Sequence, residues 1–267
     1  MTALCEIRGL SVTYRGEAAP ALGGIDLDIH AGERLAIIGE SGSGKSTFAR
    51  ALAGLLPEGA RVAGHMRWTA GSSPQPGRDL GFVFQDPTAS LNPVLTVGEQ
   101  VGEGARRHLG LSWKAAHSLA VEMLEKVRLP DPERTAKAFP HQLSGGQRQR
   151  VAIAAALACG PGMLVADEAT SALDMVVQAE IVALLGDLVG AAGMTLLFIT
   201  HDIALASGFA DRVAIFRKGA LVEAGPTRAV LAAPEAAYTK TLIASHRDLA
   251  TPPLIRAVAP LIRAVAP

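Results

Sequence analysis

The feature that most constrains this chain is a glycine-rich segment that ends in lysine and serine. It reads Gly39-Glu40-Ser41-Gly42-Ser43-Gly44-Lys45-Ser46, is followed by Thr47, and matches G-x-x-x-x-G-K-[ST] at every fixed position. Glycines in this pattern let successive backbone N–H groups turn toward a phosphate, and a following helix N-terminus adds partial positive charge. Lys45 would contact the β- and γ-phosphates, and the Ser46 hydroxyl would ligate Mg²⁺. The segment therefore predicts a nucleotide-binding loop.

The residues on either side of this loop fit a strand–loop–helix unit. Residues 34–38, which are apolar after Arg34, predict a buried strand, and residues 46–56 predict a helix. A glycine-rich turn without a ligand is the alternative reading of the same residues. The combination of strand, loop, lysine and helix favours the nucleotide site.

Composition sets broad limits on the class of protein. The chain has 267 residues, of which 49% are hydrophobic, enough for one large α/β domain or two small ones. Its formal net charge is +0 and it has no run of basic residues, which argues against nucleic acid as the main partner. Cys5 and Cys159 fit no metal-ligand spacing, so we expect buried core thiols in a reducing compartment.

No membrane-spanning segment is expected. The longest apolar run, residues 151–166, is interrupted at residues 160–162 and is shorter than a bilayer requires. The N-terminus has neither a basic segment nor an apolar core, so no signal peptide is expected. We therefore expect a cytoplasmic protein, with any membrane connection made through a partner.

Two kinds of periodicity divide the chain. Alternating residues at 6–14 and 25–29 predict half-exposed antiparallel strands, and a further strand is expected at 61–68. Short apolar runs predict buried strands at the following positions: 80–84, 163–166 and 195–200. Helical periodicity predicts helices at 97–108, 112–128, 145–158 and 176–189. Ser112 and Ser144 are the expected N-caps of the second and third of these helices.

These elements predict an α/β fold in which a helical block, about residues 86–158, is inserted into a parallel sheet. A hairpin at 212–216 and 220–223 and short helices within about 226–246 complete a domain expected to cover residues 1–246. Residues 247–267 contain a tandem Leu-Ile-Arg-Ala-Val-Ala-Pro heptapeptide, which predicts a disordered tail.

Several polar residues at strand or helix ends could serve a nucleotide. Asp167 and Glu168 end a strand, where the first could hold Mg²⁺ through water and the second polarise an attacking water. Gln85 and His201 each follow a strand, and Tyr14 ends the first strand, but each alone is as readily a surface residue. The segment Leu143-Ser144-Gly145-Gly146-Gln147 predicts a second anion-binding nest at a helix N-terminus.

Taken together, these motifs resemble the nucleotide-binding subunits of ABC transporters. That family's motifs occur here in the same order: the phosphate loop, Gln85, the signature at 143–147, Asp167-Glu168, Ser171-Ala172-Leu173-Asp174 and His201. The match runs from about residue 4 to about residue 242. The resemblance implies a RecA-like P-loop NTPase core, an antiparallel β subdomain and an inserted helical subdomain.

The resemblance also implies roles for individual residues. Tyr14 would stack on adenine, and residues 39–47 would hold the phosphates. Magnesium would be surrounded by Ser46, Gln85 and Asp167. Glu168 would be the general base, with Gln85 and His201 beside the γ-phosphate and the attacking water. Two subunits would pack head to tail, each presenting to the other's nucleotide Ser144, Gly145, Gly146 and Gln147, with Asp174 coupling the two sites.

A finer resemblance concerns the peptide and nickel importer ATPases. Residues 84–93 are similar to that subfamily's segment after the glutamine, and residues 234–242 resemble its His-Pro-Tyr-Thr region, with Ala236-Ala237 in place of His-Pro. Ala169 stands where the family usually has proline. The subfamily's cysteine-rich extension is missing, so no iron–sulfur cluster is expected.

The leading hypothesis is therefore an ATP-hydrolysing subunit of an importer for small peptides, nickel or metal–chelator complexes. Its expected partners are a second ATPase, identical or a paralogue, transmembrane permease subunits near residues 85–92, and indirectly an extracytoplasmic binding protein, with no nucleic acid. One alternative is a non-transport ABC ATPase in a soluble enzyme complex, for example in phosphonate breakdown. Another is a nucleotide-bound scaffold, against which Glu168 and His201 argue.

Overall fold

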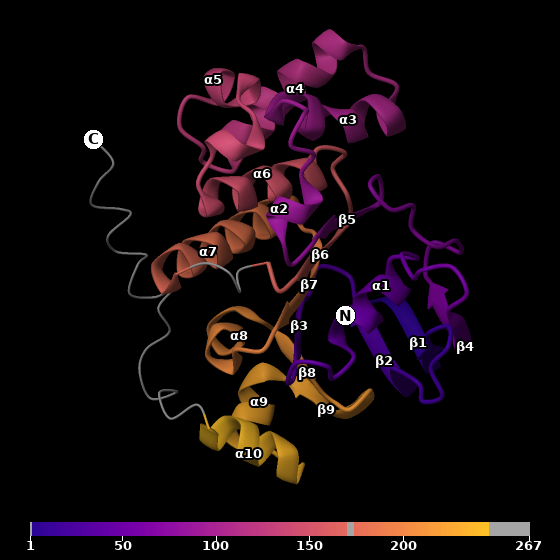
Figure 1. Ribbon diagram of the computed structural model, residues 1–267. Helices are drawn as coiled ribbons and strands as arrows, with labels where there is room; N and C mark the ends of the chain where they lie inside the picture. The colour runs from indigo at the N-terminus through magenta and orange to yellow at the C-terminus, as the bar shows by residue number, and fades with distance from the viewer. Residues whose placement is uncertain (1, 170–173, 246–267) are drawn as a thin grey trace. The chain divides into compact units, whose positions relative to one another are not determined.

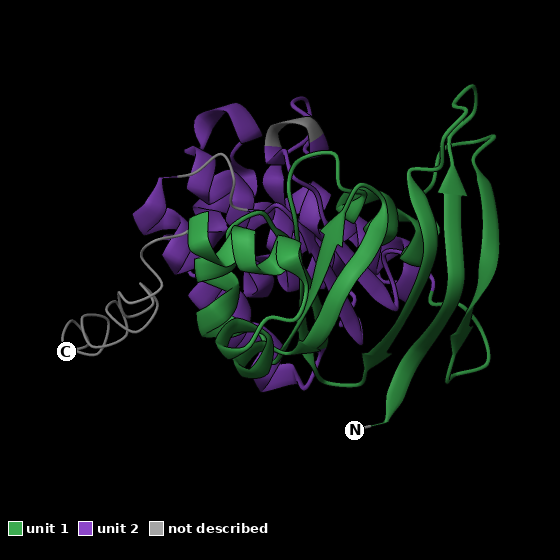
Figure 2. Cartoon of the chain, turned by 90° about the horizontal axis from the view of Figure 1, so that it is seen from below, with its two compact units in different colours: residues 1–74, 195–267 green, residues 75–194 purple. Residues whose placement is uncertain are grey.

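The computed structural model describes residues 2–169 and 174–245 (Figure 1), apart from the side chains of Thr88 and Ala89. The chain forms two compact units, coloured separately in Figure 2. Unit 1 consists of Met1–Pro74 and Thr195–Pro267, and unit 2 is Gln75–Met194. The tail predicted at 247–267 lies outside the described residues.

The first sheet of unit 1 is antiparallel and has three strands in the order β2-β1-β4. These strands are β1 (Ala3–Thr13), β2 (Leu22–His30) and β4 (Arg61–Trp68). Cys5, Ile7 and Val12 on β1 are fully buried, whereas most of β4 is exposed. The half-exposed antiparallel strands expected from the alternating pattern are therefore confirmed.

The second set of strands in unit 1 is mainly parallel. Strand β3 (Arg34–Ile38) pairs in parallel with β7 (Thr195–Thr200) and β8 (Arg212–Arg217), and β9 (Ala220–Pro226) runs antiparallel to β8. Every residue of β7 is buried, as expected of a central strand in a parallel sheet. The register pairs Ile38 with Thr200, so the residues that follow β3 and β7 emerge at one edge.

The part of unit 1 that the structure describes has four helices: α1 (Lys45–Leu52), α8 (Ile203–Phe209), α9 (Thr227–Ala232) and α10 (Ala237–Ser245). The expected helix at 46–56 ends earlier, because Gly54 adopts φ +67° and the Leu55 N–H returns to the Arg50 carbonyl at 2.8 Å. Helix α8 was not predicted. Asp202 begins it by accepting from the Ala204 and Leu205 N–H groups at 2.7 and 3.2 Å.

Unit 2 contains a parallel pair of strands and most of the helices. Strands β5 (Leu80–Val83) and β6 (Met163–Asp167) pair in parallel. The helices are α2 (Pro87–Ser90), α3 (Val97–Leu109), α4 (Trp113–Lys126), α5 (Pro132–Lys137), α6 (Gly145–Leu157) and α7 (Met175–Ala192), with a 3₁₀ turn at Pro140–Gln142. Ser112 and Ser144 cap α4 and α6 as predicted. Helices α2 and α5 were missed because segments of four and six residues are too short for periodicity to reveal.

Helix α7 departs from the expectation that no segment could span a membrane. Within the described residues it is the one helix whose length and mean hydropathy, 1.7, would suit a bilayer. Its residues Ile181, Val182 and Leu185 are nevertheless buried within unit 2. Of this 18-residue window 33% is buried, and a single helix of such length and composition is weak evidence for a membrane span.

The two cysteines differ in their surroundings. Cys5 is fully buried, and burial raises the pKa of its thiol to about 12, so it is a core residue as predicted. Cys159 is only partly buried. The prediction that both thiols lie in the core is therefore wrong for Cys159.

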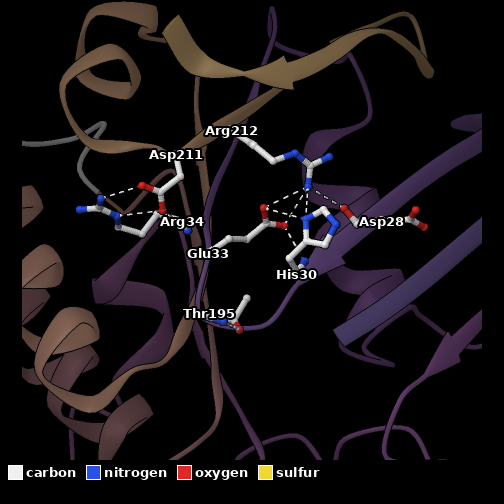
Figure 3. Close-up of polar contacts among 8 residues, drawn as sticks. Asp28, His30, Glu33, Arg34, Thr195, Asp211 and Arg212 are labelled. Carbon is white, nitrogen blue, oxygen red and sulfur yellow. Dashed lines mark hydrogen bonds and ion pairs between the residues drawn. The ribbon is translucent and has the colours of Figure 1, made fainter. Parts of the chain in front are cut away.

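A buried ion pair joins the turn between β2 and β3 to β8 (Figure 3). Glu33 is 2% exposed, and its carboxylate accepts from Arg212 Nη1 at 3.0 and 3.1 Å and from the His30 N–H at 2.7 Å. Arg212 Nη1 also donates to the Asp28 carbonyl at 3.0 Å. A buried carboxylate is tolerated only when its oxygens find such partners. The pair therefore fixes β2 against the parallel strands of unit 1.

Removing this carboxylate tests its importance. We expect Glu33→Ala to lower the free energy of unfolding by about 3 kcal/mol, because Arg212 keeps its charge and loses its carboxylate partner. The matched control is Glu6→Ala, which breaks the pair with Arg67, whose side chain is 73% exposed, and should cost less than about 1 kcal/mol. Urea unfolding measures both, and equal losses would contradict a special role for Glu33.

Candidate functional site

The predicted phosphate loop connects β3 to α1, and its glycines are required by its geometry. Gly42 and Gly44 adopt φ +77° and +99°, a region that side chains disfavour. A Cβ on Gly39 would lie 2.2 Å from the Phe216 carbonyl oxygen, and one on Gly44 would lie 2.8 Å from the Ala21 carbonyl oxygen. Backbone from β8 and from the residue just before β2 thus packs directly against the loop.

The lysine of the loop is held by the loop itself. Lys45 is 4% exposed, and its Nζ donates to the carbonyl oxygens of Gly39 at 2.8 Å and of Glu40 at 2.9 Å. These bonds compensate a buried ammonium group without neutralising its charge. Lys45 is therefore a fixed positive charge at the first turn of α1.

These residues fit a phosphate group. Helix α1 begins at Lys45 after a glycine, so its first N–H groups receive no side-chain cap. Ser43 Oγ is buried and has no hydrogen-bond partner among the described residues. Helix N–H groups that no side chain caps, a buried ammonium and an unsatisfied hydroxyl together form a site that favours an oxyanion.

Two other predicted site residues of unit 1 lie close to the loop in the fold. The Tyr14 hydroxyl is 3.0 Å from the Thr47 hydroxyl, which places Tyr14 beside the first turn of α1. His201 follows β7 and is exposed, and β7 ends at the same edge as β3. Within unit 1, Tyr14 and the strand end that precedes His201 therefore lie near the phosphate loop.

Unit 2 brings together Gln85 and Glu168. Strands β5 and β6 end at one edge, with Val83 paired to Ala166. Gln85 Nε2 donates to Glu168 Oε2 at 2.9 Å. Glu168 has φ +45°, a left-handed conformation that is uncommon for a residue with a side chain and is often found at functional positions. Asp167, the last residue of β6, is 3% exposed.

The signature segment forms the N-terminus of α6. Ser144 and Gln147 make a reciprocal capping box, in which Ser144 Oγ accepts at 3.3 Å and Gln147 Oε1 accepts at 2.9 Å. A Cβ on Gly146 would lie 2.9 Å from Val177 Cγ1, so glycine lets α6 approach α7. Gly145 is the first residue of α6 and is partly exposed. The signature segment therefore begins a helix in unit 2, as expected, with Ser144 as its N-cap.

Asp174 is the N-cap of α7, a local role that was not predicted from the sequence. Its Oδ1 accepts from the Val176 and Val177 N–H groups at 3.1 and 3.0 Å and so caps α7. An aspartate directly before an apolar helix is a recognisable capping signal. The other members of the predicted coupling segment, residues 171–173, lie outside the described residues.

Two contacts to the phosphate loop are not evident from the sequence. The Gly219 N–H donates to the Ser43 carbonyl at 3.0 Å, and the Glu40 N–H donates to the Tyr238 hydroxyl at 3.4 Å. The second contact joins residues 198 positions apart, a separation that no local pattern predicts. Both contacts come from the C-terminal part of unit 1.

Much of this chain is similar in sequence to known proteins. The family model described as ABC transporter matches residues 22–171. A peptidoglycan transport ATP-binding protein of Agrobacterium fabrum is 42% identical over 255 residues, covering 91% of this chain and 47% of that protein. A putative peptide import ATP-binding protein of Brucella melitensis is 40% identical over 263 residues, covering 91% of this chain and 77% of that protein. The chain thus spans about half the length of the first relative and most of the second.

A solved structure extends the similarity to the fold. The ATP-binding cassette MJ0796, in a dimeric post-hydrolysis state bound to ADP and Pi, aligns with a TM-score of 0.73 and 32% identity. The alignment covers 84% of this chain and 99% of that one. This similarity confirms the predicted fold class, an α/β P-loop NTPase core with an antiparallel β subdomain and an inserted helical subdomain. From its family match and its relatives, this chain belongs to the ABC transporter family.

Proposed function

We propose that this chain is an ATP-binding and ATP-hydrolysing subunit of an importer. The observation that carries the proposal is the phosphate loop, where a buried Lys45 ammonium lies beside uncapped N–H groups of α1. Phosphoryl transfer needs positioned charge more than covalent chemistry, and this loop supplies it. The family membership and the relatives' names agree with this function.

The residues divide the work of hydrolysis. The loop N–H groups from residues 42–47 and Lys45 Nζ bind the phosphates, and Tyr14 stacks on the base. Ser46, Gln85 and Asp167 would hold Mg²⁺, which would supply neutralising positive charge to the phosphate oxygens. Glu168 accepts a proton from the attacking water, and His201 orients that water beside the γ-phosphate. The contact between Gln85 and Glu168 keeps the carboxylate side chain oriented before nucleotide binds.

A second ATPase subunit completes each site. The N-terminus of α6, residues 144–147, carries a helix dipole and the N–H groups of Gly145 and Gly146 beside the capping box of Ser144 and Gln147, which suit the γ-phosphate of a nucleotide held by the partner. Because both subunits supply donors, charge neutralisation is complete only on closure, which links hydrolysis to movement. The similar cassette MJ0796 is dimeric, which supports this proposal. Asp174, which begins α7, belongs to the segment that couples the two sites.

The proposed cargo is a small peptide, with nickel or a metal–chelator complex as further possibilities within the resembling subfamily. The two relatives compared are named for peptidoglycan transport and peptide import, which favours peptides over metals and import over a soluble enzyme complex. Permease subunits hold the chain at the cytoplasmic face of the membrane near residues 85–92. An extracytoplasmic binding protein delivers the cargo to them.

Replacing the proposed base separates binding from turnover. Glu168→Gln should bind ATP like the wild type, hydrolyse it about 10²- to 10⁴-fold more slowly, and accumulate as a closed dimer. Phosphate release measures the rate, and size-exclusion chromatography measures the dimer. The control is Glu122→Gln on α4, an exposed carboxylate paired with Lys126. Hydrolysis at the wild-type rate in Glu168→Gln would remove this residue from the mechanism.

Replacing the loop lysine tests nucleotide binding itself. Lys45→Ala should weaken MgATP binding by at least about tenfold, because hydrogen bonds from charged groups contribute about 1.5–3 kcal/mol. Lys126→Ala, which removes an exposed ammonium from α4, should leave affinity unchanged. Titration calorimetry gives both dissociation constants. Equal affinity of Lys45→Ala and the wild type would contradict a nucleotide site at this loop.

Purification of the full chain with its bound partners distinguishes the importer from the soluble alternative. We expect tagged chain to be recovered from detergent extracts of membranes together with polytopic subunits and a second ATPase. Mass spectrometry identifies these partners. Recovery of soluble enzymes without any membrane subunit would contradict the importer while leaving ATP hydrolysis intact.

A further inference from the structure

The C-terminal helix α10 reaches the phosphate loop through Tyr238. The Tyr238 hydroxyl accepts the Glu40 N–H at 3.4 Å, although 198 residues separate them. Tyr238 is 7% exposed, and the guanidinium carbon of Arg217 lies 4.5 Å from the centre of its ring. The ring is thus held on one side by a cation–π contact while its hydroxyl points to the loop.

Helix α10 is firmly attached to the rest of unit 1. Glu223 on β9 accepts the Glu235 and Ala236 N–H groups at 2.9 and 3.2 Å, just before the helix begins. Tyr238 and Leu242 belong to a buried apolar cluster that also contains these residues: Ala36, Ile38, Ile203, Ala206, Val213, Ile215 and Val230. This cluster includes the end of β3, from which the phosphate loop departs, so the position of α10 is tied to that of the loop.

The peptide unit that Tyr238 contacts is the one that holds the loop lysine. The Glu40 N–H and the Gly39 carbonyl belong to a single planar peptide group and point in opposite directions. The N–H donates to Tyr238 while the carbonyl accepts Lys45 Nζ at 2.8 Å. A hydrogen bond at one end of a peptide group fixes the direction of the dipole at the other end and strengthens its bond. Tyr238 therefore acts on Lys45 through one rigid group.

The turn between β8 and β9 supports the far end of the same loop. Gly219 donates to the Ser43 carbonyl at 3.0 Å, and the Phe216 carbonyl lies where a Gly39 side chain would be. Arg217, which covers the Tyr238 ring, is in this same turn region. The hairpin and α10 together brace the side of the loop that faces β8.

The phenol stays neutral at physiological pH. Burial raises the pKa of Tyr238, and the neighbouring Glu40 carboxylate adds to this shift. A neutral hydroxyl accepts the Glu40 N–H without bringing a negative charge next to bound phosphate. The group therefore suits a supporting role beside an anionic ligand.

We propose that Tyr238 is a positioning residue of the nucleotide site, whose hydroxyl orients the Gly39–Glu40 peptide and through it Lys45. Helix α10 thereby contributes to nucleotide affinity although it supplies no phosphate ligand. This inference rests on the proposed function, since it requires that the loop bind a nucleotide. The competing explanation is that Tyr238 only fills the apolar cluster, in which case its ring matters and its hydroxyl does not.

The variant Tyr238→Phe separates these explanations because it keeps the ring and removes only the hydroxyl. We expect its dissociation constant for MgADP, measured by titration calorimetry, to rise about two- to tenfold, the net contribution of one hydrogen bond. The thermal midpoint of the nucleotide-free variant should stay close to that of the wild type. The control is Thr241→Val, which removes an exposed hydroxyl of α10 that donates to the Ala237 carbonyl at 3.1 Å, and should leave affinity unchanged.

An unchanged dissociation constant in Tyr238→Phe would overturn the inference, as would an equal loss of affinity in Thr241→Val. Either result is distinct from failure of the proposed function, in which the wild type itself would not bind MgADP or would bind no better than Lys45→Ala. The wild type offers a second test by NMR if Tyr238→Phe does not fold. The Glu40 amide should exchange with solvent at least about tenfold more slowly than its intrinsic rate, and exchange at the intrinsic rate would overturn the inference.

Discussion

The bonds from Lys45 Nζ to the Gly39 and Glu40 carbonyls are the interaction on which the phosphate site depends. A buried ammonium must be compensated, and the loop does so with carbonyl oxygens that leave its positive charge available to a phosphate. For these carbonyls to face the lysine, the loop must turn tightly where β3 ends. The glycines permit that turn, and the backbone of Phe216 and Ala21 packs against it too closely for any larger residue.

The residue that follows β6 in unit 2, Glu168, is also held in a defined conformation. Glu168 takes a left-handed backbone conformation, and Gln85 holds its carboxylate at 2.9 Å. The next residue, Ala169, is 1% exposed and stands where the family usually has proline. Proline restricts the backbone of the residue that precedes it, so alanine at this position leaves Glu168 with fewer constraints from its neighbour.

Much of this arrangement could be predicted from the sequence because its causes are local. The run at 34–38, the glycines at 42 and 44, and the serine caps at 112 and 144 each act within a few residues, and the structure has them where they were expected. Helices α2, α5 and α8 were missed because they are too short to show periodicity, although Asp202 carried a capping signal. The contact between Glu40 and Tyr238 depends on how β3, β8 and α10 pack, which no single segment encodes. Long-range supports of a site are therefore what sequence patterns predict least well.

The central claim, that residues 39–47 hold the phosphates of a nucleotide, is tested most directly by a crystal structure of the full chain with Mg²⁺ and a non-hydrolysable ATP analogue. We predict the β- and γ-phosphate oxygens within hydrogen-bond distance of Lys45 Nζ and of the backbone N–H groups of residues 42–47. A triphosphate bound elsewhere on the chain, with this loop empty, would contradict the claim.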